Sequence, residues 1–225
     1  MCFSPEGDLV GGVVVATIGI DACRHLHGRR EYLFVAGLPI LLGFHQIDEA
    51  FVWWSLRGVV QPVVGTVATW IYLLFALVLL PFIAPMLVLS IEPTKARRRR
   101  IIPFVLLGAA VGLYLFVTLL RTHPTVRLGS YHLAYSFGLR HGIPVVVAYV
   151  VATCGAMLAS KMRHVVWFGA ANLVFVVILA RLSADGFTSL WCFYAALASG
   201  VVALYLRLSP PKECMDPAAV DVILT

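Results

Sequence analysis

Charged residues are scarce in this sequence, where they make up only 12% of 225 residues. None of the five cysteines forms a CxxC pair, which argues against a zinc ribbon or a redox dithiol. The motifs of nucleotide-binding loops, serine hydrolases and zinc proteases are missing, as is the Asp-Asp-x-x-Asp motif that binds magnesium diphosphate. These absences argue against chemistry driven by nucleotides or by diphosphate ionisation.

Apolar residues are abundant instead: 61% of the residues are hydrophobic and the mean hydropathy is +0.94. Such values lie outside the range of soluble domains and indicate an integral membrane protein. A membrane-spanning helix needs about 20 apolar residues, and the runs are too long and too uniformly apolar for barrel strands. We therefore predict an all-α bundle of seven transmembrane helices, at 9–26, 33–55, 62–90, 101–121, 143–161, 164–183 and 187–207.

Basic residues cluster in alternate connections, which explains the formal charge of +6 without a nucleic-acid partner. The connections at 57–61 and 183–186 are poor in Lys and Arg. By the positive-inside rule the amino terminus lies outside and the carboxyl terminus inside. Arg127 and Arg140, in the long outer connection, disagree with this orientation. The basic segments are 25–30, 95–100, 161–163 and the tail with Arg207 and Lys212.

The chain is predicted to form one membrane domain over 1–208, with a disordered cytoplasmic tail at 209–225. No cleavable signal peptide is expected, because the residues before the first apolar run are acidic and the run ends at Arg24. We expect a multi-pass protein of the cell inner (plasma) membrane.

Two features are expected to interrupt the regular helices. Pro81 and Pro85 should kink or break the third apolar segment. The connection 122–142 is long for a bundle, and long connections are often functional. Tyr131, His132 and Tyr135 fit one helical turn there, so this connection is expected to extend the fifth helix.

Polar residues crowd into the second apolar segment, where His45, Gln46, Asp48 and Glu49 fall within five positions. At 3.6 residues per turn, His45 and Glu49 lie one turn apart on the same helix face, with Asp48 beside them. Ionisable groups at membrane depth are costly and usually functional. The alternative is a buried polar cluster that only fixes this helix to its neighbours.

Other polar and aromatic residues are predicted to lie at the same depth as Glu49, near the outer ends of their segments. We expect one outward-opening pocket. Arg181 has an alternative role as the salt-bridge partner of Asp48 or Asp185. The residues predicted to bind substrate are Gln46, Trp53, His132, Tyr135, Arg181, Trp191 and Tyr194.

A carboxyl group in an apolar site is favoured in its neutral form and can donate a proton. Useful acid catalysis then needs neighbours that stabilise the charge left behind, for which His45, Gln46 and Arg181 are candidates. The aromatic residues from Trp191 to Tyr194 can stabilise a cation through their ring faces.

Three stretches, Met1-Cys-Phe-Ser4, Gln46-Ile-Asp-Glu-Ala-Phe-Val-Trp53 and Leu190-Trp-Cys-Phe193, resemble a family of uncharacterised bacterial integral membrane proteins. More loosely, the chain is similar to membrane-embedded terpene cyclases of meroterpenoid and indole-terpenoid pathways. Those enzymes have seven helices and protonate an alkene or epoxide. The looser resemblance implies Glu49 and Asp185 as the acidic pair.

The leading hypothesis is therefore a cofactor-independent cyclase of a lipophilic prenylated aromatic, with Glu49 as proton donor, Asp48 and His45 tuning it, and Asp185 as second acid or base. One alternative is a metal-dependent lipid hydrolase. The other is a proton-coupled transporter or sensor. In the hydrolase alternative, the metal ligands would come from His45, Glu49, His132, Asp185 and Cys192.

Separately, Cys2 and Cys192 are candidates for a disulfide.

Overall fold

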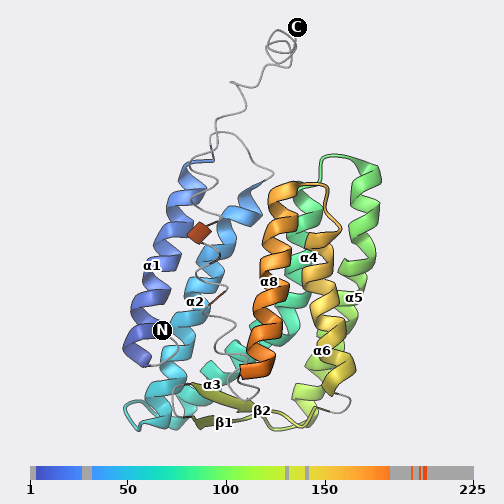
Figure 1. Cartoon of the computed structure of the whole chain (residues 1–225). Coiled ribbons are helices and arrows are strands. Elements are labelled where there is room, and N and C mark those ends of the chain that lie inside the picture. The colour runs from blue at the N-terminus through green and yellow to red at the C-terminus, as the bar shows by residue number, and fades with distance from the viewer. Residues whose placement is uncertain are drawn as a thin grey trace, which may run out of the picture.

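The computed structural model describes residues 4–26, 32–129, 132–139, 142–182, 194, 198, 200 and 201. Its helices stand side by side in an upright bundle, and two short strands lie across the lower end (Figure 1). The first six predicted segments fall on helices, whereas most of the seventh, 187–207, lies outside the described residues. The helices are α1 Pro5–Arg24, α2 Leu33–Leu56, α3 Pro62–Leu73, π-helix η2 Leu74–Leu79, α4 Leu80–Ile91, α5 Lys95–Arg121, α6 Gly142–Val150, π-helix η3 Val151–Gly155, α7 Ala156–Leu158 and α8 Arg163–Leu182.

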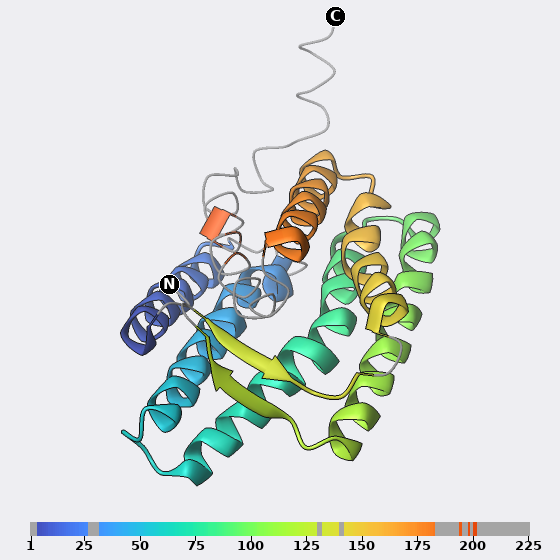
Figure 2. The same cartoon turned by 60° about the horizontal axis from the view of Figure 1, so that its bottom comes forward.

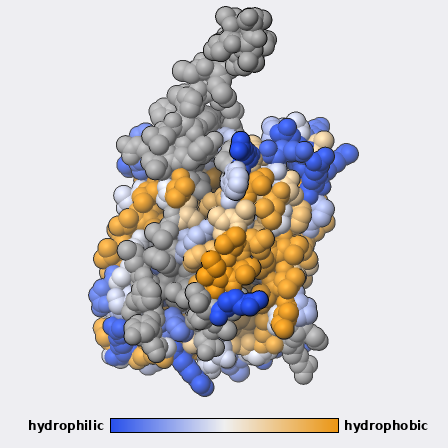
Figure 3. Space-filling view, viewed as in Figure 1, coloured by the Kyte–Doolittle hydropathy of each residue, from blue (hydrophilic) through white to orange (hydrophobic). Residues whose placement is uncertain are grey.

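Within the described ranges, three helices are long and apolar enough to cross a membrane. They are α2, the continuous helix from Pro62 to Ile91, and α5. Hydrophobic residues cover the middle of the face in Figure 3, and hydrophilic residues gather towards its upper and lower ends. The prediction of a helical membrane protein is confirmed at this level.

Helices that are joined by a connection run in opposite directions, whereas α3, η2 and α4 form one continuous helix. In Figure 1, α1 ends and α2 begins at the upper end, where the basic connections α4–α5 and α7–α8 also lie. The connection α2–α3 and the two strands lie at the lower end. The alternation of basic and less basic connections along the sequence thus corresponds to two opposite ends of the bundle.

Small residues bring α1 and α2 into close contact. Glycines on each helix face the backbone of the other: a Cβ atom at Gly12 would lie 2.6 Å from the carbonyl oxygen of Gly43, and one at Gly43 would lie 2.6 Å from the backbone nitrogen of Ala16. Higher up, a Cβ at Gly19 would lie 2.8 Å from the backbone nitrogen of Ile40. This packing of small residues is typical of membrane helix pairs.

Pro81 and Pro85 were expected to kink or break the third segment, and the expected break is wrong. The helix continues to Ile91, and the π-helix η2 directly precedes the turn with Pro81. Gly108 and Gly112 of α5 approach the carbonyls of Pro81 and Val78 so closely that no side chain would fit. Neighbouring helices and local π-helical adjustment are the usual means of accommodating proline in a membrane helix.

The expectation that the connection 122–142 extends the fifth predicted segment, 143–161, as a helix is wrong. Strands β1 (Thr125–Leu128) and β2 (Leu133–Ser136) form an antiparallel hairpin, in which Val126 pairs with Tyr135. Pro124 and the β-branched pair Thr125-Val126 disfavour helix. The buried Leu133 packs on Val52, Trp53 and Ala68, so burial fixes the hairpin against the bundle. Figure 2 shows the hairpin lying across this end.

Candidate functional site

The lower half of α2 carries a buried polar face. Glu49 has no exposed surface, and His45 and Gln46 are almost completely buried. Their spacing places His45 and Glu49 one turn apart, as the sequence predicts. Buried ionisable groups inside an apolar bundle are costly, so this face is the strongest candidate site on the described part of the chain.

Three aromatic rings form a stack beside this face. The ring of His45 lies 4.1 Å from that of Tyr72, centroid to centroid, and the two planes differ by 18°. Tyr72 also stacks against Tyr135, with the ring centroids 4.5 Å apart and an angle of 10° between the ring planes. Phe75 also contacts His45, at 4.7 Å. The stack joins α2, the helix from Pro62 and strand β2, so the hairpin contributes directly to the site.

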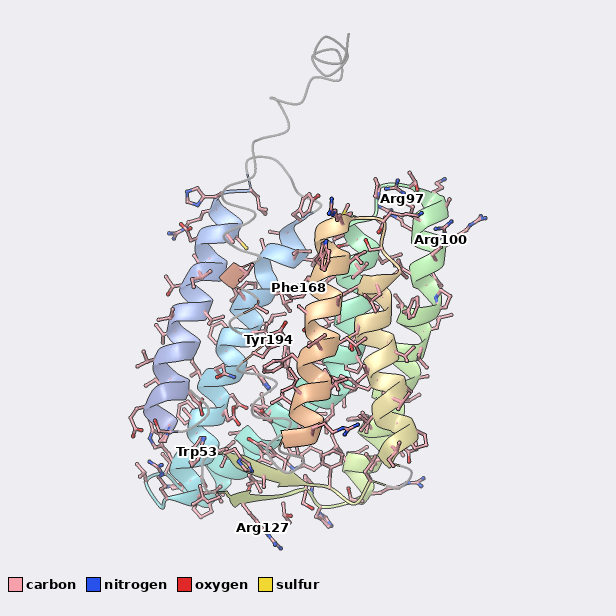
Figure 4. The ribbon with its side chains drawn as sticks, in the orientation of Figure 1. Trp53, Arg97, Arg100, Arg127, Phe168 and Tyr194 are labelled. Carbon is pink, nitrogen blue, oxygen red and sulfur yellow. The ribbon has the colours of Figure 1, made fainter. Side chains whose placement is uncertain are left out.

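Trp53 lies one turn below Glu49, near the lower end of the bundle (Figure 4). Its ring is buried in the cluster with Leu133, and the guanidinium of Arg57 lies 5.2 Å from the ring centroid. The indole N–H has no hydrogen-bond acceptor among the described residues. Trp53 therefore lies between the buried polar face and the hairpin, and its predicted role in substrate binding stays a prediction.

Asp8 is a buried acidic residue that the sequence analysis missed. It has no exposed surface and belongs to the face of α1 that packs on α2. Because Gly12, one turn later, faces Gly43 and Ile47, the antiparallel register brings Asp8 near the level of Glu49. The spacing of Asp8, Gly12 and Gly19 along one helix face is the sequence pattern from which it could have been found.

Asp48 points in a different direction from Glu49. It is only partly buried and lines a shallow groove of about 360 Å³ between α2 and α3. Its Oδ2 atom has no hydrogen-bond partner within the described chain. The other residues of the groove are apolar: Phe51, Val63, Val64, Val67, Ala68 and Ile71. Asp48 and Glu49 thus belong to different environments, although they are adjacent in sequence.

The remaining predicted residues are dispersed. His132 is half-buried in the hairpin, and its carbonyl accepts a hydrogen bond from the backbone N–H of Gly129 at 2.8 Å. Arg181 is exposed at the end of α8 and forms no ion pair within the described chain. Tyr194 stacks on Phe175 at 3.9 Å. Asp185 and Trp191 lie outside the described residues, so their predicted roles are untested.

A family model matches residues 1–216 of this chain, almost its full length. The chain belongs to the DUF6629 family. This is a family of unknown function, in agreement with the first of the two sequence resemblances. No curated protein matches the chain. No solved structure matches it either. The looser resemblance to terpene cyclases therefore stays a prediction.

For this DUF6629 member, the described residues contain no group of three or more His, Cys, Asp or Glu side chains placed to hold a metal ion. Cys2, Asp185 and Cys192, which the sequence analysis considered as metal ligands or disulfide partners, lie outside the described residues. What the structure brings together is an acid, an imidazole, an amide and several aromatic rings. Such a set of groups is suited to proton transfer on an apolar molecule.

Proposed function

We propose that this DUF6629 protein is an intramembrane cyclase that acts on a prenylated aromatic such as a prenyl indole. Glu49 donates a proton to an alkene or epoxide of the substrate. The observation that carries the proposal is the complete burial of Glu49 one helical turn from His45, whose ring belongs to a stack of three aromatic side chains.

In this proposal Glu49 reacts from its neutral form, which is the form that donates a proton. Transfer of its proton to an alkene carbon converts the π bond into a C–H bond and leaves a carbocation. The aromatic ring of the substrate then attacks the cation, which closes the new ring. Loss of a ring proton restores the aromatic system. The proton returns directly to the carboxylate of Glu49, or it is taken by Asp185 and passed on to Glu49, which restores the acid.

The stacked rings support the second half of this reaction. Phe75 presents an aromatic group beside His45, and ring faces stabilise cations. Tyr72 has a different role, because His45 and Tyr135 cover both faces of its ring and it holds the imidazole in place. Trp53 packs with Leu133 of the hairpin below Glu49, and a buried site protects a carbocation from water. Asp48, in its separate groove, and His45 tune the acid in this proposal. A lipophilic substrate reaches such a site from the bilayer without a soluble domain or a cofactor.

We further propose seven spans, with the amino terminus outside and the carboxyl terminus inside the cell membrane. Support comes from the grouping of the basic connections at one end of the bundle. In this orientation the site around Glu49 lies in the outer half of the membrane.

The test replaces Glu49 by Gln, which keeps the shape of the side chain and removes the acidic proton. Purified protein in lipid nanodiscs is given 3-geranylindole and its epoxide, and products are separated by chromatography with mass detection. We expect wild-type protein to form a cyclised isomer and Glu49→Gln to lose at least about 100-fold in rate, the lower end of general acid contributions. Glu6→Gln is the matched control, because Glu6 is exposed on α1. Equal rates for Glu49→Gln and wild type would reject the proposal.

A further inference from the structure

The start of α5 concentrates positive charge at one end of the bundle. Five of the six residues from Lys95 to Arg100 are Lys or Arg, and all of these but Arg97 are exposed. Figure 4 shows Arg97 and Arg100 at the upper end of this helix, far from the hairpin. This is the densest run of charge in the sequence, and the proposed reaction does not use it.

The position of these cations in the helix makes them more unusual. A helix N-terminus already carries a partial positive charge, so acidic residues are favoured there and basic ones are not. The first turn of α5 contains no acidic residue. Only the side-chain oxygen of Thr94, which accepts a hydrogen bond from the backbone N–H of Arg97 at 3.3 Å, caps this end. The first two turns of α5 therefore lack the negative charge that would balance them.

Within the described residues, no carboxylate supplies that negative charge. Among the described residues the one ion pair is His25–Asp21, at another connection. The acid next to the run, Glu92, is fully buried, and its Oε1 atom accepts hydrogen bonds from the hydroxyl of Ser160 at 2.5 Å and from the backbone N–H of Lys161 at 3.2 Å. The cations of α5 are thus left without a carboxylate partner in the described chain.

The same Glu92 holds the surface in shape. Its backbone carbonyl accepts a hydrogen bond from Nε of Arg98 at 2.8 Å, while its carboxylate binds the connection between α7 and α8. Lys161 and Arg163 belong to that connection. Two basic connections are therefore joined through one buried side chain, which preorganises a shared cationic surface.

An exposed apolar stripe begins directly below these cations. Ile102 lies one turn after Arg98 and Arg99, and it is followed along α5 by Leu106, which is 65% exposed, and by Leu113. Figure 3 shows hydrophilic residues above a hydrophobic surface on this side of the molecule. A cationic patch directly above an exposed apolar helix face matches a phospholipid, with its anionic headgroup above and its acyl chains below.

We propose that the surface formed by Lys95–Arg100, Lys161 and Arg163 is a binding site for an anionic phospholipid, such as phosphatidylglycerol or cardiolipin. The headgroup phosphate is bound by the guanidinium groups and by the positive end of α5. The acyl chains lie along Ile102, Leu106 and Leu113.

The test measures lipid binding by native mass spectrometry of the full chain released from mixed micelles, with phosphatidylglycerol titrated against phosphatidylcholine. We expect wild-type protein to bind phosphatidylglycerol at least about tenfold more tightly, and Arg99→Gln/Arg100→Gln to lose most of this preference, since each cation near an anionic surface contributes measurably. The charge-conserving variant Arg99→Lys/Arg100→Lys should retain it.

The matched control is Arg121→Gln/Arg127→Gln, which removes two exposed cations from the opposite end of the bundle. It should keep the preference for phosphatidylglycerol. An equal loss in this control would mean that overall charge, not this surface, attracts the lipid, and would overturn the proposal. Protection of wild-type protein against thermal unfolding by inorganic phosphate alone, to the same extent as by phosphatidylglycerol, would also overturn it, because a free anion would then suffice.

Discussion

At the residue scale, the buried face of α2 combines groups that rarely occur inside a membrane bundle. Glu49 and Gln46 are buried beside the imidazole of His45. That imidazole contacts aromatic rings from the neighbouring helix instead of lying in an aqueous channel. Asp48, although adjacent in sequence, lines a groove on another side of α2. Position around the helix therefore separates Glu49, the proposed proton donor, from Asp48.

Tyr72 should be the most sensitive aromatic position in this site. Its ring is completely buried and stacks on both His45 and Tyr135. Replacement by alanine leaves a cavity between α2 and the hairpin, and we expect the free energy of unfolding to fall by about 3 kcal/mol or more. Unfolding is followed by circular dichroism during titration of the micelles with sodium dodecyl sulfate.

Tyr114→Ala is the control for that measurement. Tyr114 lies on α5 and is 39% exposed, so the loss there should be about 1 kcal/mol or less. A loss at Tyr72 no larger than the loss at Tyr114 would show that the stack does not hold the helix and the hairpin together.

Some site residues could be predicted from the sequence and others could not. His45, Gln46 and Glu49 interrupt an apolar run at helical spacing, and polar residues within such a run are expected to face the interior. Tyr72 was missed because an aromatic residue in an apolar segment usually faces lipid or packs in a core, and only tertiary contacts place it against His45. Asp8 was missed because it follows directly on a short acidic segment that is expected outside the membrane.

At the element scale, the pair α1–α2 depends on close contact between backbones. Gly43→Ala should lower the free energy of unfolding by about 1–3 kcal/mol, because the new methyl group would overlap the backbone of Ala16. Gly37→Ala, on the same helix, has no atom within 4 Å of the added carbon. It should raise stability by about 0.5–1 kcal/mol through helix propensity. We expect the changes in the free energy of unfolding of the two variants, measured by the same titration, to have opposite signs. Equal changes would contradict the close contact between the backbones of α1 and α2 at Gly43.

Helix positions were predictable because hydrophobic runs of membrane length have few alternatives to helix. The largest difference in a helix end is at α5, which begins at Lys95 instead of residue 101. Hydropathy ends a segment at the first charges, whereas Thr94 caps a helix that begins six residues earlier, at Lys95. The hairpin was not predicted, because the tyrosines at 131 and 135 fit a helical turn as well as a strand, and only the burial of Leu133 and the stacking of Tyr135 decide between them.

At the scale of the whole molecule, charge and hydropathy give the bundle two different ends. The end with Arg97 and Arg100 is strongly basic, and the opposite end carries the hairpin below Trp53. The basic end is expected to face the cytoplasm. The aromatic site and the proposed lipid surface then lie in opposite halves of the membrane.

Cysteine labelling tests this orientation. Val59 in the connection α2–α3 and Ala96 at the start of α5 are both exposed. In a variant without native cysteines, a maleimide that cannot cross membranes should label Val59→Cys in intact cells, and Ala96→Cys only after permeabilisation. The reverse pattern would place the amino terminus inside and would invert the proposed topology.

The most direct test of the central claim follows the proton itself. Wild-type protein in nanodiscs is supplied with 3-geranylindole in D₂O, and the cyclised product is weighed by mass spectrometry. Protonation by Glu49, which exchanges with solvent, predicts one deuterium on a carbon of the new ring and at least about 100-fold slower product formation by Glu49→Gln. A cyclised product without deuterium, or one formed equally well by Glu49→Gln, would contradict the account.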